Sequence, residues 1–259
     1  MPNDLGGAAA APDLAPVAAP ETVGRRLRRM DARSATIPFP ASATPREVRP
    51  AKAKRVHVVE HPIAQHALTV LRNKHTLPEP FRRASHQLLA ILAAEATRTL
   101  PLREEAIETP AADHVGRLIA RPVVFLSLTR HGIGLAHDIA AVVPDISIGA
   151  ISLERPHRDQ PLEPRLSLVG APPLDAVRVL LFEPVVSGGL SATLALKHLR
   201  GSGATDLALL SFVASAPGLD AVLADVPDLT VWTAAVDPEW DPKRGTLPGL
   251  GDFARRLYG

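Results

Sequence analysis

Three segments of the sequence place charged or hydroxyl side chains beside glycines. The first, residues 183–191, reads Glu-Pro-Val-Val-Ser-Gly-Gly-Leu-Ser and lies between a strand pattern and a helix pattern. Glycines let backbone N–H groups close around an anion, and the dipole of a following helix favours negative charge. The segment therefore predicts a phosphate site, with the hydroxyls of Ser187 and Ser191 as further donors. The alternative is a tight turn in which Ser191 caps the helix, and the spacing alone does not decide between the two.

Arginines follow two other segments that have the pattern of strands. Arg130 follows the apolar run 122–129, and Arg155 follows the run 146–153. The planar donor fork of a guanidinium suits a second anionic group. Residues 154–175 are polar and rich in proline, and loops of that length within a domain are often lids or binding loops.

The third segment lies near the carboxyl end of the chain. Residues 247–252 read Leu-Pro-Gly-Leu-Gly-Asp and follow Asp237, which comes after the last predicted strand. Glycines at this density could bring backbone groups close to a small planar ligand. The alternative is an ordinary C-terminal turn.

Metal and dinucleotide sites are not indicated. The ten histidines do not have the spacing of a known ligand set, and the chain has no cysteine, so we predict neither a metal site nor a disulfide. The Gly-x-Gly at residues 132–134 is too short for a dinucleotide-binding fingerprint.

Apolar runs alternate with helical patterns along most of the chain. Strands are predicted at residues 122–129, 146–153, 177–182, 207–214 and 230–236, and helices at 63–71, 81–100, 132–143, 190–201 and 217–224. Alternation of this kind predicts an α/β fold with a parallel sheet flanked by helices. Ligands of such sheets bind beyond the carboxyl ends of the strands, where all three segments are expected to lie.

Composition divides the chain into two parts. Overall, 46% of the residues are hydrophobic and 22% are charged, as in globular proteins. Residues 1–55 are instead rich in alanine and proline and hold ten basic against five acidic residues, which predicts a disordered basic extension before a folded domain over residues 56–259. The folded part is mildly acidic and has no apolar run long enough to span a bilayer. We therefore expect a cytoplasmic protein that binds neither nucleic acid nor membrane.

Several motifs in residues 56–259 resemble those of uracil phosphoribosyltransferases. They lie at residues 61–66, 68–74, 95–98, 100–102 and 107–110, and again at 233–237, 248–252 and 256–259. The resemblance implies a type I phosphoribosyltransferase fold, in which a hood or flexible arm accompanies the sheet. It also implies a pentosyltransferase that moves ribose 5-phosphate from phosphoribosyl pyrophosphate (PRPP) to uracil or a related heterocycle and releases pyrophosphate. Mg²⁺ carried by PRPP would stabilise the leaving group, and the chain would form a homodimer or a higher homo-oligomer.

The resemblance further implies roles for individual residues. Arg130 and Arg155 would lie near the pyrophosphate, and Glu183 would face the ribose hydroxyls; these three are the candidate catalytic residues. The PRPP site would be completed by Ser187, Gly188, Gly189 and Ser191. The base would be bound by Thr246, Gly251, Asp252 and Phe253. Residues 154–175 would form the arm that closes over PRPP and excludes water.

The sequence departs from the family pattern in the phosphate loop, where Gly188 also stands in place of a threonine in an alignment without gaps, at the end of the first strand, where His131 replaces an alanine, and beside the base. Glu183 stands in place of an aspartate, Leu190 in place of the second glycine of the phosphate loop, and Phe253 in place of an alanine beside the base. A side chain at Leu190 interferes with the approach of backbone to phosphate, and Phe253 would fill or reshape the base pocket. These changes support an alternative, in which the chain keeps the scaffold but catalyses a different reaction in a specialised pathway, or serves as a non-catalytic binding or regulatory protein.

Overall fold

The computed structural model describes residues 55–154 and 161–259, without the side chains of residues 130, 131, 137 and 138. These residues belong to one compact unit, residues 47–259. The expected N-terminal extension lies outside the described residues except for Arg55.

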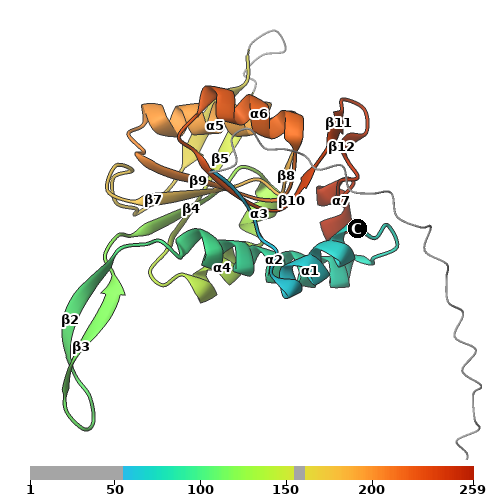
Figure 1. The fold of residues 1–259 in the computed structure, drawn as a ribbon. Helices are drawn as coiled ribbons and strands as arrows, with labels where there is room; N and C mark the ends of the chain where they lie inside the picture. Colours follow the sequence, from blue (N-terminus) through green and yellow to red (C-terminus); the bar gives the residue numbers. More distant parts are fainter. Residues whose placement is uncertain (1–54, 155–160) are drawn as a thin grey trace, which may run out of the picture. The chain divides into compact units, whose positions relative to one another are not determined.

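A central sheet, mostly parallel, organises the described residues (Figure 1). Its strands lie in the order β1 (Val56–Val58), β10 (Thr230–Asp237), β9 (Asp206–Ser215), β7 (Arg178–Phe182), β4 (Val123–Ser127), β5 (Ser147–Glu154) and β6 (Glu163–Ser167). The short β8 (Val185–Val186) continues from β7 and also pairs with β9. Every pairing in this sheet is parallel except that of β5 with β6. The predicted α/β class, with a parallel sheet flanked by helices, is confirmed.

Helices cover both faces of the sheet (Figure 1). One face carries α1 (Pro62–Arg72), α2 (Pro78–Thr97), α4 (Ala136–Val142) and α7 (Phe253–Tyr258), and the other carries α5 (Leu190–Gly201) and α6 (Ala216–Asp225). Adjacent side chains of a strand point to opposite faces, so Leu180 packs with the first group of helices and Leu181 with the second. This is why the inner strands are largely apolar on both faces.

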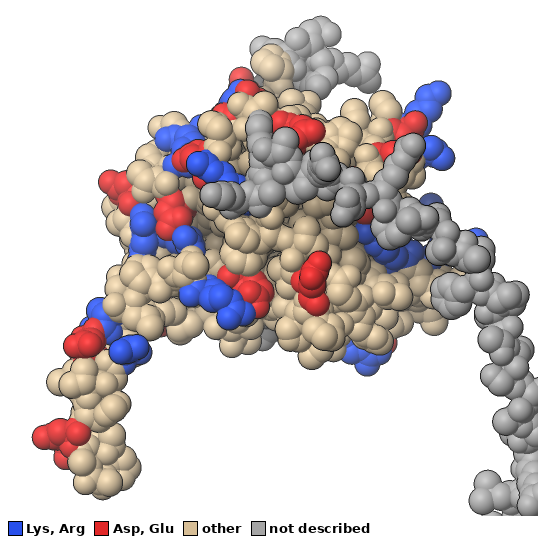
Figure 2. Space-filling view, viewed as in Figure 1, with Lys and Arg blue, Asp and Glu red and all other residues tan. Residues whose placement is uncertain are grey.

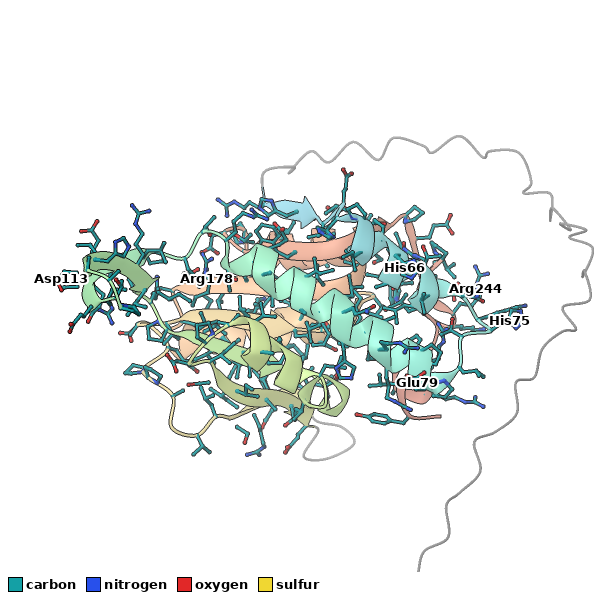
Figure 3. All side chains as sticks on the ribbon, turned by 90° about the horizontal axis from the view of Figure 1, so that it is seen from below. His66, His75, Glu79, Asp113, Arg178 and Arg244 are labelled. Carbon is teal, nitrogen blue, oxygen red and sulfur yellow. The ribbon has the colours of Figure 1, made fainter. Side chains whose placement is uncertain are left out.

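The long helix α2 crosses one face of the sheet (Figure 3). Proline at its first position suits a helix start, and its buried residues recur at helical spacing: Phe81, Ala84, Ser85, Leu88, Leu89, Leu92, Ala93 and Ala96. No described helix, α2 included, has the length and hydropathy needed to cross a bilayer.

Several pieces of structure were not expected from the sequence, among them β1, α7, two hairpins and an edge strand. The segment after α2 forms a hairpin of β2 (Leu102–Glu108) and β3 (Asp113–Ile119), and a second hairpin joins β11 (Glu239–Asp241) to β12 (Gly245–Leu247). The predicted loop 154–175 contains the strand β6, paired antiparallel with β5. This strand was not predicted within the segment, because an edge strand needs few apolar residues and β6 includes a proline and two charged side chains.

Between β4 and β7 the chain changes the side of the sheet to which it adds strands. From β4 the chain continues to β5 on one side, whereas from β7 it continues to β9 on the other. The carboxyl ends of β4 and β7 therefore flank a topological switch point, which is where open α/β sheets bind ligands.

Candidate functional site

Polar side chains end four neighbouring parallel strands at the carboxyl edge of the sheet. Thr129 follows β4, Glu183 follows β7, Ser215 ends β9 and Asp237 ends β10. Before these residues, β4, β7 and β9 are mostly buried and apolar. The sequence thus concentrates its chemistry at one edge.

Glu183 lies directly after β7, beside the switch point. Its backbone N–H donates to Leu210 O (3.1 Å), and its side-chain Oε2 is buried without a hydrogen-bond partner among the described residues. The residue as a whole keeps some exposure, but burial of the carboxyl raises the pKa of Glu183 to about 8. A carboxyl with that pKa is mostly protonated at neutral pH and can donate a hydrogen bond to a ligand.

The loop of residues 187–191, which we call the phosphate loop, is shaped by close backbone packing. Gly189 is the N-cap of α5, with φ 79°, and a Cβ there would lie 2.5 Å from Gly218 O. A Cβ on Gly188 would lie 2.9 Å from the ring of Trp240. Both glycines are therefore required by the positions of their neighbours.

Hydroxyl groups fasten the phosphate loop to two other segments. Ser215 Oγ donates to Ser187 O (2.5 Å) and accepts from Gly218 N (2.9 Å). Ser187 Oγ and Thr246 Oγ1 share a hydrogen bond of 2.9 Å. The loop is thereby tied to α6 on one side and to β12 on the other.

The remaining residues of the phosphate loop lie at the start of α5. Leu190 is its first residue and is 61% exposed, so its side chain is not packed into the interior. Ser191 is its second residue, and the cap position belongs to Gly189. The alternative in which Ser191 caps the helix was therefore wrong.

Residues 246–252, which we call the acceptor loop, run from β12 to the start of α7. Thr246 is buried, while Gly249 and Gly251 have φ of 63° and 70°. The peptide bond from Leu247 to Pro248 is cis. Asp252 caps α7 by accepting from Arg255 N (3.1 Å). Gly249 is buried, so the loop exposes backbone at Gly251, next to the exposed Asp252 at its end.

Two arginines that the sequence analysis did not single out hold the acceptor loop. Arg72 on α1 pairs with Asp237, and both contact Gly249. Arg256 on α7 donates to Leu250 O (2.7 Å). No local pattern marks these residues, because their partners lie far away in the sequence.

Arg256 also joins the loop to the corner between α1 and α2. It donates to Leu71 O and to Asn73 O (2.6 Å for the latter), and its guanidinium lies 4.4 Å from the centroid of the Phe81 ring. Burial lowers the pKa of Arg256 from its ordinary value.

Phe253 occupies a different environment from the one expected beside a base. It is buried, with its ring centroid 5.5 Å from that of Phe81 and 5.7 Å from that of Phe212. Phe212 in turn contacts Phe182 on β7. The ring therefore belongs to the aromatic core beneath the site.

The two predicted catalytic arginines are placed less completely. Arg130 begins the short helix α3 (Arg130–Ile133), after the N-cap Thr129, and its side chain is not among those described. Arg155 lies outside the described residues. The backbone of Arg130 nevertheless follows the carboxyl end of β4, which pairs with β7 up to Phe182, the residue before Glu183.

In the described part of the chain, no group of three or more His, Asp or Glu side chains could hold a metal ion. The raised pKa of Glu183, about 8, favours its protonated form at neutral pH, and a protonated carboxyl is a poor metal ligand.

Hollows elsewhere in the described residues lie away from this edge. One of about 220 Å³, beside Arg178, Thr230 and Trp232, is at the opposite, amino-end edge of the sheet. A larger one lies along the β2–β3 hairpin. Neither includes a residue of the phosphate or acceptor loop.

Comparison with known proteins gives a consistent result. The family model described as uracil phosphoribosyltransferase matches residues 58–259. A uracil phosphoribosyltransferase of Thermus thermophilus is 35% identical over 207 residues, which are 79% of this chain and 99% of the relative. One of Rhodococcus jostii is 32% identical over 206 residues, 79% of this chain and 98% of the relative. The solved structure of the AQ2163 protein from Aquifex aeolicus superposes with a TM-score of 0.70 at 22% identity, covering 78% of this chain and 97% of that one; it supports the fold.

Proposed function

Because the chain belongs to the uracil phosphoribosyltransferase family and is thus a pentosyltransferase, we propose that it transfers ribose 5-phosphate from PRPP to uracil and releases pyrophosphate. The coarse activity, phosphoribosyl transfer, follows from the family. The choice of PRPP as donor and uracil as acceptor is the proposal.

One observation carries the proposal more than any other. The hydrogen bond between Ser187 and Thr246 joins the phosphate loop to the acceptor loop at the carboxyl edge of the sheet. A phosphorylated sugar on the first loop would therefore lie beside a flat ring on the second. Holding two reactants in this relation removes much of the entropic barrier to transfer.

The proposal gives each segment a role. The backbone and hydroxyls of Ser187, Gly188, Gly189 and Ser191 hold the 5-phosphate. Glu183 faces the ribose hydroxyls, where a protonated carboxyl donates a hydrogen bond and an ionised one stabilises positive charge on the ribose. Arg130 and Arg155 stabilise the departing pyrophosphate, with which Mg²⁺ enters as part of the substrate.

Backbone groups of Thr246 and Gly251, with the carboxylate of Asp252, take the edge of the base. The position of Phe253 supports uracil as the acceptor, because its ring packs on Phe81 and Phe212. Exposed Leu190 supports retention of the phosphate site, since its side chain is not buried in the loop. The substitutions at Phe253 and Leu190 are therefore weaker support for a different reaction than the sequence alone suggested.

A turnover assay tests the proposal. Purified full-length protein is incubated with PRPP, Mg²⁺ and a panel of nucleobases and related heterocycles, and pyrophosphate release is measured together with the nucleotide formed. We expect pyrophosphate and a uridine nucleotide in equal amounts with uracil. Turnover only with another ring would replace the acceptor, and no turnover across the panel would refute the activity.

The proposed assembly is at least a dimer, and it is supported by the β2–β3 hairpin. This hairpin projects from the body (Figures 1 and 2) and exposes apolar side chains on both of its faces. They are Leu102 and Val115 on one face and Ile107 and Leu118 on the other. A two-stranded hairpin is marginal alone in water, so a second copy of the chain is a reasonable cover.

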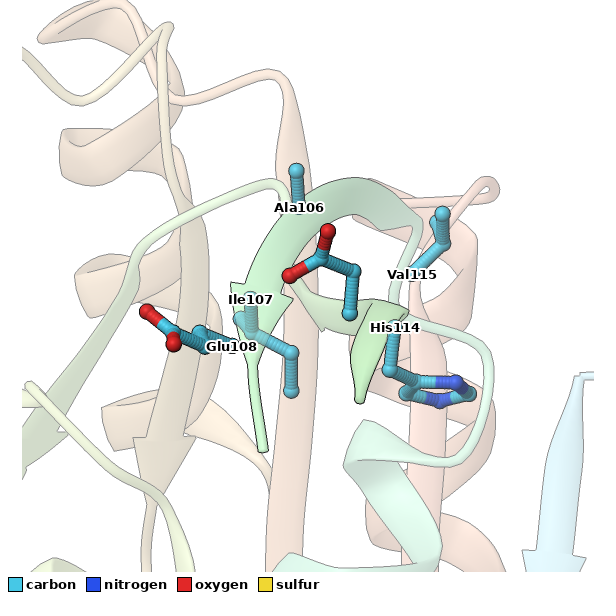
Figure 4. A pocket seen from close by; sticks show the side chains of 6 residues that line it. Ala106, Ile107, Glu108, His114 and Val115 are labelled. Carbon is cyan, nitrogen blue, oxygen red and sulfur yellow. The ribbon is translucent and has the colours of Figure 1, made fainter. Parts of the chain in front are cut away.

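A hollow of about 730 Å³ lies along the hairpin, lined by Ala106, Ile107, Glu108, Asp113, His114 and Val115 (Figure 4). Light scattering after size exclusion tests the assembly: we expect a dimer or larger species for the wild type and a shift towards monomer for Val115→Glu. A monomeric wild type would refute it.

A further inference from the structure

Asp237 and Arg72 together hold both backbone polar groups of Gly249. Asp237 Oδ1 accepts from Arg72 Nη2 (2.6 Å), and Oδ2 accepts from Arg72 Nη1 (3.1 Å) and from Gly249 N (2.8 Å). Arg72 Nη1 also donates to Gly249 O (3.1 Å). The two side chains, which together we call the clamp, therefore hold both the N–H and the carbonyl oxygen of Gly249 in the acceptor loop.

The clamp is sheltered from solvent. The side chain of Asp237 is 3% exposed and that of Arg72 is 24% exposed. Removing one member of such a pair leaves a buried charge without compensation. The bidentate guanidinium–carboxylate arrangement also fixes orientation, which a lysine in place of Arg72 could not do.

The backbone at Gly249 needs such a restraint. Its φ of 63° lies in the left-handed region, and a Cβ at this position would lie 2.1 Å from Thr246 O. The loop thus doubles back on itself tightly between Thr246 and Gly249, immediately before Gly251 and Asp252. A small rotation at Gly249 would displace every later group of the loop.

The simplest competing explanation is an ordinary ion pair that attaches α1 to the sheet. The chain contains an ion pair of that kind for comparison. Arg178 pairs with Asp206 (Nε to Oδ2, 3.1 Å) and donates to Ala96 O (3.0 Å). Its side chains are 19% and 24% exposed, and it touches no residue of the acceptor loop.

This second pair lies at the far side of the fold from the first. Arg178 lies near the carboxyl end of α2, whereas Glu79 marks the end next to α1 (Figure 3). Arg178→Lys therefore makes the same chemical change as Arg72→Lys without touching the site.

We propose that Arg72 and Asp237 are positioning residues that set the acceptor loop for the nucleobase. The inference rests on the proposed function, because it assigns the loop to the acceptor. The new element is that affinity for the base depends on the guanidinium of Arg72, which holds Gly249 although the two residues are 177 positions apart.

Steady-state kinetics of the full-length protein test the role. For Arg72→Lys we expect the KM for uracil to rise about ten-fold, on the scale of one charged hydrogen bond. The KM for PRPP should stay within about two-fold, because the phosphate loop makes no contact with the clamp. Arg178→Lys should leave both KM values unchanged.

A second variant, Asp237→Asn, tests the same role if Arg72→Lys does not fold. Asp237→Asn keeps the size of the side chain and an oxygen for Gly249 N–H, but it removes the charge that faces Arg72. We expect the same selective rise in the KM for uracil. Hydrogen exchange of the acceptor loop without substrates should also be faster in both clamp variants than in Arg178→Lys.

The outcomes separate the two ideas. A wild type without turnover would refute the proposed function and this role with it. An active Arg72→Lys protein with an unchanged KM for uracil, or one in which both KM values rise equally, would overturn the positioning role alone.

Discussion

The phosphate loop and the acceptor loop achieve a defined shape by different means. The phosphate loop is confined by steric contact: its glycines lie against Gly218 and Trp240, where no side chain fits. The acceptor loop is confined by charged hydrogen bonds from Arg72, Asp237 and Arg256. The shape of the phosphate loop thus depends on the absence of side chains at its own glycines. The shape of the acceptor loop depends on side chains from distant parts of the sequence.

The difference has a consequence for mutation. Adding an atom to a glycine of the phosphate loop should disturb the backbone at that residue. Altering a distant charged partner should displace the acceptor loop more than it lowers the free energy of unfolding. The following changes test that contrast, beginning with the largest expected effect.

The largest effect is expected from Gly189→Ala. A Cβ here would meet Gly218 O at 2.5 Å in a backbone with φ 79°. We expect the free energy of unfolding to fall by about 2–4 kcal/mol, from overpacking and left-handed strain together. PRPP binding should be lost, as measured by calorimetry under conditions where the variant is folded.

Gly203→Ala is the matched control for that change. Its φ is 97°, but no atom lies within 4 Å of the added Cβ. Only the backbone strain remains, so a cost of about 1–2 kcal/mol is expected, with PRPP affinity unchanged. Equal effects of the two variants on PRPP affinity would contradict the steric account of the phosphate loop.

Glu183→Gln should alter how stability depends on pH. In the wild type the folded carboxyl holds its proton up to a pKa of about 8, while the unfolded one releases it near its ordinary value of 4.5. The free energy of unfolding therefore falls as pH rises from about 4.5 to about 8. Because the residue keeps some exposure, we expect a total of about 2–3 kcal/mol, below the full value of the shift.

Urea unfolding at pH 5 and pH 9 measures this term. The variant should match the wild type at pH 5 and exceed it in stability at pH 9. A constant difference between the two proteins across that range would show that the carboxyl is not buried as described.

Phe253→Leu distinguishes a core residue from a base contact. The ring packs against Phe81 and Phe212, so its loss should lower the free energy of unfolding by about 1–2 kcal/mol. The KM for uracil should change by less than about three-fold, since a direct contact would be worth more. A large rise in the KM for uracil with an unchanged free energy of unfolding would show that Phe253 contacts the base.

The smallest effect is expected from Ser187→Ala, which removes the hydrogen bond to Thr246 (2.9 Å). A neutral pair of this kind contributes about 1 kcal/mol. We expect a small loss of stability and a moderate rise in both KM values, because the bond connects the two loops. An unchanged KM for uracil would show that the loops act independently, because the KM for PRPP also depends on the contact of the Ser187 hydroxyl with the 5-phosphate.

The phosphate loop could be found in the sequence because its determinants are local. An apolar strand, an acidic residue, two glycines and a helix follow one another over residues 177–201, and α5 begins and ends where the pattern predicted. Five strands of the sheet (β4, β5, β7, β9 and β10) could be predicted for the same reason, since each is largely an apolar run, whereas β1, β6 and β8 could not.

The clamp could not be found in this way. Arg72 and Asp237 are 165 positions apart, and each has the appearance of an ordinary surface residue until the fold brings them together. The role of Phe253 at the base was predicted from its neighbours in the sequence, and its packing against Phe81 and Phe212 depends on contacts that the sequence does not display. The β2–β3 hairpin was missed because it carries charged and apolar residues on both faces, which hides the alternation that identifies a strand.

Calorimetric titration of the wild-type protein with PRPP and Mg²⁺ tests the central claim most directly, because it requires no acceptor. Saturable binding of one PRPP per chain, abolished in Gly189→Ala and retained in Gly203→Ala, is the expected result. Absence of binding at millimolar PRPP would contradict the assignment of this sheet edge to a phosphoribosyl donor.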